Sequence, residues 1–260
     1  MSRYKQDFFS LLQKLKSKEH FAYTRYSDGE VFVMQNKRLV LETDHVVVGD
    51  HVYTHGYSSD DYKSFNPDEH SFVKDKLLES FSFQKKNYFV GAGCGKCTCA
   101  IQEHIPWMNQ HYKNGPEHLT TPNLLVNSNY PLFVNHFIKE FANHPIVMIC
   151  SENADTSTLP FEVVKEFRVG KNCIVNDHHL IEETKTWVKD NNITNHVFLF
   201  SASSLSEIMI YELFKDFDQN IYIDIGTTLH HHMNLGIERN YLKSFWLHEN
   251  RPEIFQSCVW

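Results

Sequence analysis

The chain has 260 residues, of which 42% are hydrophobic and 22% charged, and its net charge is −7 at pH 7. This composition is typical of a globular protein with one large domain or two small ones. The acidic balance argues against a general nucleic-acid binder, which normally has a basic face. No apolar run is long enough to span a bilayer, and the first residues lack the apolar core of a signal peptide. We therefore expect a cytoplasmic protein, with peripheral membrane contact as an alternative.

Short apolar segments alternate with longer amphipathic ones along the chain. Apolar residues at helical spacing predict a helix over 8–16, and the apolar run 21–23 predicts a strand. Further strands are predicted at 87–91, 123–127, 146–150, 173–175, 197–200 and 221–225, and further helices at 98–110, 132–141, 177–189 and 205–214. This alternation predicts an α/β fold with a mostly parallel, Rossmann-like sheet flanked by helices. The polar segment around 40–75 fits the alternation poorly, so we expect an insertion within a single domain over 1–260.

Residues 25–30, Arg-Tyr-Ser-Asp-Gly-Glu, follow the first predicted strand. Two carboxylates one residue apart on a loop, here Asp28 and Glu30, can hold a divalent cation such as Mg²⁺ or Mn²⁺ through oxygen ligands. Arg25 can bind a phosphate through paired hydrogen bonds. The segment therefore suggests an enzyme that handles a metal-bound diphosphate. The alternative is structural, because Asp-Gly is a common turn and an acidic residue often caps the start of a helix.

Two other segments follow this motif in a fixed order. Residues 88–95, Tyr-Phe-Val-Gly-Ala-Gly-Cys-Gly, predict a strand with a tight turn, and Asn-Ser-Asn-Tyr follows at 127–130. Residues 197–204, Val-Phe-Leu-Phe-Ser-Ala-Ser-Ser, precede a helix and then Tyr-Ile-Asp-Ile-Gly at 222–226. Taken in order, from about residue 21 to 226, these segments resemble the bacterial glycosyltransferases of the GT-D fold. The hallmark of those enzymes is an Arg-x-Gly-Asp-Gly-Glu segment near the N-terminus.

The resemblance implies a metal-dependent glycosyltransferase that moves a sugar from a nucleotide donor, which we expect to be a UDP-sugar. It places Mn²⁺ or Mg²⁺ at the Asp28–Glu30 pair and implies a glycan or glycoprotein acceptor. Ser27 stands where the family has glycine, and residues 201–204 stand where members tend to have Gly-Pro-Thr-Ala. These departures concern the sugar and the acceptor more than the reaction class.

Further candidate residues lie at predicted strand ends, where parallel sheets bind ligands. Asp224 ends a buried strand and is a candidate to bind a sugar hydroxyl or act as a base, or else to cap the next helix. The candidates for the donor site are Lys96, Asn127, Asn129, Tyr130, Ser201, Ser203 and Ser204. The serines open a helix, so they can hold a phosphate or form an ordinary N-cap. The segment 127–130 can instead be a turn before a helix that starts at Pro131.

For two other groups of residues the sequence favours a structural role. Cys94, Cys97 and Cys99 lack the second ligand pair of a zinc site, so we expect reduced cysteines in a tight turn. The histidines at 230–232 predict an ordinary polar helix start more readily than a metal site. The alternatives to glycosyl transfer are a metal-dependent phosphoesterase on a similar sheet and a non-catalytic relative that binds nucleotide-sugars.

Overall fold

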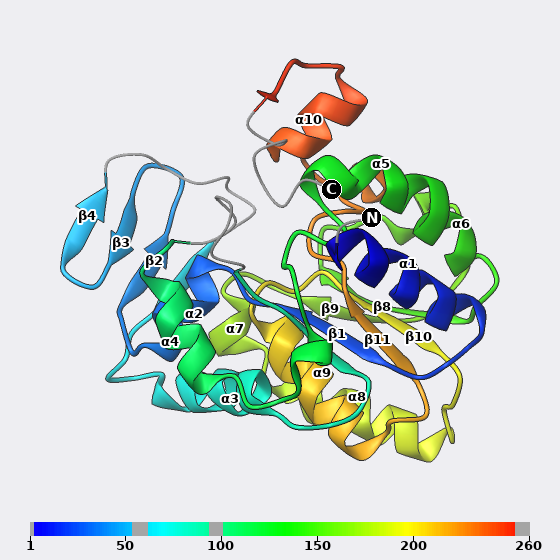
Figure 1. Ribbon diagram of the computed structural model, residues 1–260, viewed down its shortest axis with the longest axis horizontal. Coiled ribbons are helices and arrows are strands. Elements are labelled where there is room, and N and C mark those ends of the chain that lie inside the picture. The colour runs from blue at the N-terminus through cyan, green and yellow to red at the C-terminus, as the bar shows by residue number, and fades with distance from the viewer. Residues whose placement is uncertain (1–2, 54–61, 94–100, 253–260) are drawn as a thin grey trace.

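The computed structural model describes residues 3–53, 62–93 and 101–252, and it contains two sheets (Figure 1). The larger sheet has seven strands in the order β7-β6-β1-β11-β10-β8-β9, and every neighbouring pair is parallel. The strands are β1 (Ala22–Arg25), β2 (Leu39–Leu41), β3 (Val46–Val48), β4 (His51–Tyr53), β5 (Lys63–Phe65), β6 (Tyr88–Gly91), β7 (Leu119–Thr120), β8 (Ile146–Ser151), β9 (Val163–Val169), β10 (Val197–Phe200) and β11 (Ile221–Asp224). The structure confirms the predicted α/β fold with a parallel sheet flanked by helices.

Helices cover both faces of the parallel sheet (Figure 1). They are α1 (Arg3–Lys16), α2 (Asp28–Met34), α3 (Ser71–Ser82), α4 (His104–His111), α5 (Tyr130–Leu132), α6 (Ile138–Phe141), α7 (Cys173–Asn176), α8 (His179–Asp190), α9 (Leu205–Asp216) and α10 (Asn240–Trp246). Alternate residues of each central strand point to opposite faces. In β10, Phe198 and Phe200 pack with α3, α8 and α9, whereas Val197 and Leu199 pack with α1, α5 and α6. The core is therefore two apolar layers, one on each face of the sheet.

Most predicted elements are present, but two predicted strands are wrong. Residues 123–127 form a turn and bends that lead into a 3₁₀ helix at Asn127, not a strand, although Leu124 and Leu125 are buried as expected. Pro122, which follows the short edge strand β7 after Thr121, cannot donate a ladder hydrogen bond, which explains why pairing stops there. Residues 173–175 belong to the helix α7 instead, and the neighbouring edge strand is β9, which the sequence analysis missed.

The predicted helices are largely confirmed. Residues 132–141 are helical throughout, with a wider π-type turn at 133–137 between α5 and α6. The helix predicted at 98–110 is described only in part, as α4, because residues 94–100 lie outside the described residues. Within the described part of the chain, no helix has both the length and the apolar character needed to cross a membrane.

The polar segment around 40–75 contains most of the second sheet, which is antiparallel and has the order β4-β3-β2-β5. In Figure 1 this sheet stands at one end of the molecule, with β4 farthest from the parallel sheet. Asn172, at the start of α7, fixes the near edge of this sheet. Its side chain accepts a hydrogen bond from the backbone N–H of Ser64 at 2.8 Å and donates one to the Ser64 carbonyl at 2.9 Å.

Candidate active site

Several of the predicted site residues lie at the carboxyl edge of the parallel sheet, where β1 ends at Arg25 and β11 ends at Asp224. These two strands are neighbours. On one side of them the strand order continues as β1-β6-β7, and on the other side it continues as β11-β10-β8, so the order reverses between β1 and β11. Such a switch point leaves a crevice in which open parallel sheets bind ligands. The strand order therefore points to this edge before any side chain is considered.

Arg25 and Asp224 form a partly buried ion pair at the switch point. Arg25 Nε donates to Asp224 Oδ2 at 2.9 Å, and the two side chains are 18% and 4% exposed. Burial would lower the pKa of Arg25, but the Asp224 carboxylate outweighs burial and raises this pKa above its usual value. The other oxygen of Asp224 accepts a hydrogen bond from the backbone N–H of Gly226 at 2.8 Å. Asp224 thus holds Arg25 in place, and within the described residues no side chain accepts a hydrogen bond from the two terminal nitrogens of Arg25.

Gly226 makes room for the guanidinium of Arg25. Its φ is +49°, and a Cβ at this position would lie 2.0 Å from Arg25 Nη2. Only glycine combines that backbone conformation with this close approach at no steric cost. The Asp-Ile-Gly sequence after β11 therefore shapes the space in which Arg25 lies.

The Asp-x-Glu motif begins a helix and does not lie in an open loop. Helix α2 starts at Asp28, and Glu30 accepts a hydrogen bond from the backbone N–H of Ser27 at 3.0 Å, as in a capping box. This is the structural alternative that the sequence analysis kept beside the metal site. Glu30 is 8% exposed.

The second oxygen of Glu30 is also engaged. Lys63 Nζ, from β5 of the second sheet, donates to Glu30 Oε1 at 3.1 Å, and the hydroxyl of Ser204 donates to the same oxygen. Burial would raise the pKa of Glu30, but the charge of Lys63 and the hydrogen bonds from Ser204 and Lys63 hold it below its usual value. Burial would lower the pKa of Lys63, and Glu30 in turn keeps it raised. Sequence analysis did not select Lys63, because nothing in its neighbourhood shows that β5 points toward α2.

Asp28 faces a different partner from Glu30. Its Oδ1 accepts a hydrogen bond from the backbone N–H of Ile101 at 2.8 Å and lies 2.9 Å from His104 Nδ1. The Asp28 side chain is 35% exposed, whereas that of His104 is 4% exposed. A carboxylate bonded to one ring nitrogen fixes the orientation of an imidazole and stabilises its protonated form. Asp28 therefore holds an imidazole in a fixed orientation beside the motif, although the sequence analysis did not select His104.

Glu207, in the first turn of α9, is a buried carboxyl group that the sequence analysis also missed. It is 3% exposed, and its Oε2 has no hydrogen-bond partner among the described residues. Burial raises its pKa well above the usual value, and the charges of Asp224 and Glu30 raise it further. Glu207 is thus close enough to Asp224 and to Glu30 for both charges to act on it. This environment favours the protonated form of Glu207.

The donor-site candidates divide between the surface and the core. Ser204 is fully buried against Glu30, while Ser203 is exposed and has a positive φ of 49° in the turn before α9. Ser201, at the end of β10, is half-buried. Asn127 starts a 3₁₀ turn with φ +53°, so the segment forms the turn that was the alternative, before a helix that starts at Tyr130. Lys96 lies outside the described residues, as do Cys94, Cys97 and Cys99.

Asn129 and Tyr130 pack inside the protein. Both are fully buried, and the hydroxyl of Tyr130 donates to the carbonyl of Thr228 at 2.9 Å. The amide nitrogen of Asn129 donates to the carbonyl of Asn123 at 3.0 Å. Burial raises the pKa of Tyr130 above its usual range. These contacts give both residues a structural role, so their part in donor binding stays a prediction.

The histidines at 230–232 and the two buried cysteines occupy structural positions in the fold. Residues 231–233 form a short 3₁₀ helix, and the ring of His231 stacks on Trp246 of α10 at 4.0 Å between centroids. Cys150 and Cys173 are buried and reduced. Burial raises the pKa of Cys173 to about 12, so this thiol carries its proton.

The Asp28–Glu30 pair does not fit a cation that both carboxylates bind. Both oxygens of Glu30 already accept hydrogen bonds, one of them from an ammonium group. Asp28 is partly exposed, so it keeps access for a cation. Among the described residues, one acidic and histidine cluster is compact enough to share an ion, and it comprises Glu42, Asp44 and His45 beside β2 and β3. That cluster contains none of the predicted metal ligands.

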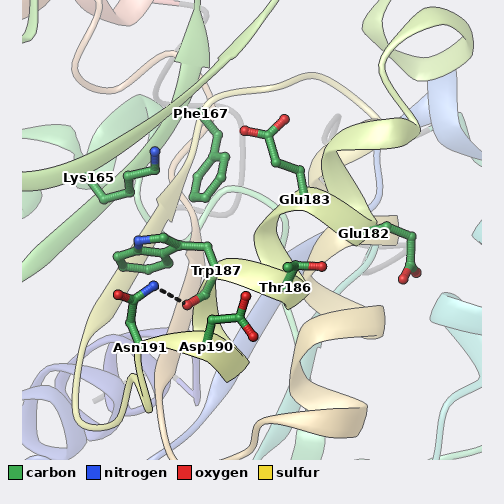
Figure 2. Close-up of a pocket in the computed structure, with 8 residues that line it drawn as sticks. All are labelled: Lys165, Phe167, Glu182, Glu183, Thr186, Trp187, Asp190 and Asn191. Atoms are coloured by element: carbon green, nitrogen blue, oxygen red, sulfur yellow. Dashed lines mark hydrogen bonds between the residues drawn. The ribbon is translucent and has the colours of Figure 1, made fainter.

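A hollow of about 460 Å³ lies elsewhere, between the edge strand β9 and α8 (Figure 2). Lys165 Nζ lies 5.0 Å above the ring of Phe167, whose centroid is 5.9 Å from that of Trp187. The other residues that line it are Glu182, Glu183, Thr186, Asp190 and Asn191. Strand β9 is four strands from β1, which is about 19 Å at the usual spacing. No predicted site residue lines this hollow, so the side-chain chemistry at β1 and β11 locates the candidate site.

No protein-family model and no curated protein sequence matches the chain. Solved structures do match. One, described as showing that the highly conserved domain of unknown function 1792 has a distinct glycosyltransferase fold, has a TM-score of 0.54 at 12% identity and covers 88% of this chain and 81% of its own. A selenomethionine structure of the same domain has a TM-score of 0.55 at 12% identity, with 88% and 81% covered. A new glycosyltransferase of this domain type from Streptococcus sanguinis has a TM-score of 0.55 at 11% identity, with 88% and 84% covered. The chain therefore has the fold of these glycosyltransferase structures, which confirms the fold that the GT-D resemblance implied.

Proposed function

We propose that this protein is a glycosyltransferase that moves a sugar from a nucleoside-diphosphate donor, with a UDP-sugar as the expected donor, to a hydroxyl group of a glycan or glycoprotein. One observation carries the proposal. The partly buried Arg25, held by Asp224, has two terminal nitrogens without an acceptor among the described residues, at the switch point of a glycosyltransferase fold. A guanidinium presented in this way suits the oxygens of a diphosphate.

The reaction forms a bond between the acceptor oxygen and the anomeric carbon and breaks the bond between that carbon and the phosphate oxygen. The leaving nucleoside diphosphate gains negative charge, and the acceptor hydroxyl loses its proton. Arg25 would stabilise the charge on the leaving phosphates, because a fixed cation in a partly buried site acts strongly there. The N-terminus of α9, which follows the carboxyl end of β10, adds the positive end of a helix dipole at the same edge of the sheet.

We assign the acceptor proton to the Asp28–His104 pair. The 2.9 Å contact between Asp28 Oδ1 and His104 Nδ1 leaves Nε2 as the nitrogen that would receive a proton. Asp28 would then stabilise the imidazolium, as carboxylates do in catalytic triads. Asp224 is less suited to this step, since both of its oxygens already accept hydrogen bonds.

Three finer features stay predictions. Asp28 can contribute to a Mn²⁺ or Mg²⁺ site, and no step above depends on such an ion. The acceptor class, glycan or glycoprotein, follows from the resemblance of the motifs. A cytoplasmic location likewise stays a prediction.

The test is calorimetric titration of the protein with UDP and then GDP. For wild type we expect binding of UDP, and for Arg25→Lys a dissociation constant at least about tenfold higher, because lysine keeps the charge but loses the planar fork. Arg168→Lys is the matched control, since Arg168 is paired with Glu166 on the distant strand β9 and should leave UDP affinity unchanged.

Each alternative function gives a different result. Nucleotide binding without transfer from any UDP-sugar would favour the non-catalytic relative. Hydrolysis of simple phosphate esters would favour the phosphoesterase. If neither UDP nor GDP binds to the folded wild-type protein, the donor site at Arg25 is ruled out.

A further inference from the structure

The GT-D resemblance and the structure disagree about Glu30. The resemblance implies a divalent cation shared by Asp28 and Glu30, whereas the structure surrounds the Glu30 carboxylate with protein donors. Oε1 accepts from Lys63 Nζ at 3.1 Å and from the Ser204 hydroxyl, and Oε2 accepts from the Ser27 backbone N–H at 3.0 Å. A buried carboxylate with three donors has little need of a metal, because its charge is already compensated.

The side chain of Lys63 is buried and hydrogen-bonded beside Glu30. It lies on β5, its side chain is 6% exposed, and its ammonium also donates to the Ser204 hydroxyl. It lies against the motif itself, because a Cβ on Gly29 would be 3.5 Å from Nζ. The pairing of β5 with β2 and the two hydrogen bonds from Asn172 to Ser64 fix the strand that carries Lys63.

The charges around Lys63 also balance without a metal. The ammonium forms an ion pair with Glu30, and Glu207 is the other carboxyl group close enough to influence the pKa of Lys63. A neutral Glu207 leaves one positive and one negative charge in this buried cluster. A divalent cation on Glu30 Oε1 would lie within a few ångströms of the ammonium, where like charges in a buried site repel strongly.

We propose that Lys63 is the resident cation of Glu30 and takes the place that a divalent metal ion would otherwise occupy. Glu30 is then a positioning residue that joins α2, β5 and the turn before α9, and Asp28 is the one carboxylate of the motif open to a metal ion. The consequence for the donor rests on the proposed function: the diphosphate meets Arg25 and not a metal ion bound by Glu30.

The experiment measures Mn²⁺ binding by electron paramagnetic resonance, with Mn²⁺ alone and no nucleotide, on four full-length proteins. These are wild type, Glu30→Gln, Lys63→Met and the double variant Lys63→Met/Glu30→Gln. We expect Glu30→Gln to change the Mn²⁺ dissociation constant by less than about twofold, because Glu30 is not a ligand. Lys63→Met should bind Mn²⁺ about tenfold or more tightly, because it frees a carboxylate beside Asp28, and the double variant should lose this gain.

The double variant keeps the test valid if Lys63→Met folds poorly, because it leaves no unpaired charge in the buried cluster. In that case Mn²⁺ should raise the melting temperature of Lys63→Met but not that of the double variant. Glu212→Gln is the matched control, since Glu212 is a buried partner of Lys76 and Lys185 away from the site, and it should leave Mn²⁺ affinity unchanged.

The outcome that overturns the proposal is a loss of Mn²⁺ affinity of about tenfold or more in folded Glu30→Gln, which would make Glu30 a metal ligand. An unchanged affinity in folded Lys63→Met would also overturn it. The failure of the proposed function looks different: no variant would then bind UDP, while the Mn²⁺ comparison would still decide the role of Lys63.

Discussion

At the scale of single residues, the environment rather than the residue type separates the carboxyl groups of the candidate site. Glu30 is ionised beside Lys63, and Asp224 is held by Arg25. Glu207 forms no ion pair with any described residue, and its pKa is strongly raised. Asp28 is partly exposed beside His104. The four groups have similar chemistry in water, so only burial and partners give them different roles.

Glu207 gives a prediction about stability and pH. Its pKa is raised in the folded protein, so folding retains a proton that the unfolded chain releases above the ordinary value of 4.5. Stability from this group is complete below pH 4.5 and falls as pH rises toward the folded pKa, by about 1.4 kcal/mol per pH unit. Glu207→Gln should therefore gain unfolding free energy relative to wild type as pH rises from 5 to 8, which urea unfolding at four pH values would measure.

Glu212, on the same helix, is the control with the opposite sign. Its pKa is lowered by the hydrogen bonds and charges of Lys185 and Lys76, which outweigh burial. Glu212→Gln should therefore lose stability above pH 4.5 and lose less as pH falls. Equal slopes for the two variants would contradict the protonated state of Glu207.

At the scale of elements, local patterns predicted most helices and central strands correctly. Strands β8, β10 and β11 are unbroken apolar runs, and α8 and α9 have helical spacing, so the local signal agrees with the tertiary structure. The edges of the sheet were the weak point. The run at 123–127 is apolar because it is buried, yet it has no strand partner after Pro122, and β9 is mixed in polarity because it lies at an edge.

The turn after β11 gives a prediction at this scale. Gly226→Ala would place a methyl group 2.0 Å from Arg25 Nη2 in a residue with φ +49°. We expect a loss of about 1–3 kcal/mol of unfolding free energy, and a loss of UDP affinity as Arg25 is displaced. Thermal melting and calorimetry would measure the two effects.

Gly49→Ala isolates the backbone part of this effect. Gly49 has φ +60°, and apart from its chain neighbours no described residue has an atom within 4 Å of the position of its Cβ. The Gly49→Ala variant should lose about 1 kcal/mol of unfolding free energy because of this backbone conformation, and it should keep its UDP affinity. If Gly226→Ala behaves like Gly49→Ala in both measurements, Gly226 does not shape the Arg25 site.

At the scale of the whole molecule, the second sheet and the parallel sheet meet at the candidate site. Lys63 and Ser64 on β5 contact Glu30, Ser204 and Asn172, which belong to or border α2, α9 and α7. The polar segment around 40–75 is thus attached to the site, and it supplies Lys63 to it.

Asn172→Gly tests this attachment. It removes both side-chain hydrogen bonds to Ser64 and keeps the left-handed backbone, whose φ is +53°. We expect Asn172→Gly to lose about 1–2 kcal/mol of unfolding free energy. Its amide hydrogens should exchange faster over residues 39–53 than over β10 and β11. Hydrogen exchange read by mass spectrometry would show the difference. Asn192→Gly, at an exposed residue with φ +51°, should leave this exchange pattern unchanged. Equal exchange in both variants would mean that Asn172 does not hold the second sheet.

The sequence by itself determined the fold class, the central strands and the Arg-Tyr-Ser-Asp-Gly-Glu motif, because these depend on periodicity and on neighbours within a few residues. Only the tertiary structure decided what the motif contacts. Lys63 is 33 residues from Glu30, Ser204 is 174 residues away, and Asp224 is 199 residues from Arg25. The state of a carboxyl group depends on burial and on the charges within a few ångströms. Contacts between residues so far apart in the chain arise only when the two sheets and α9 come together.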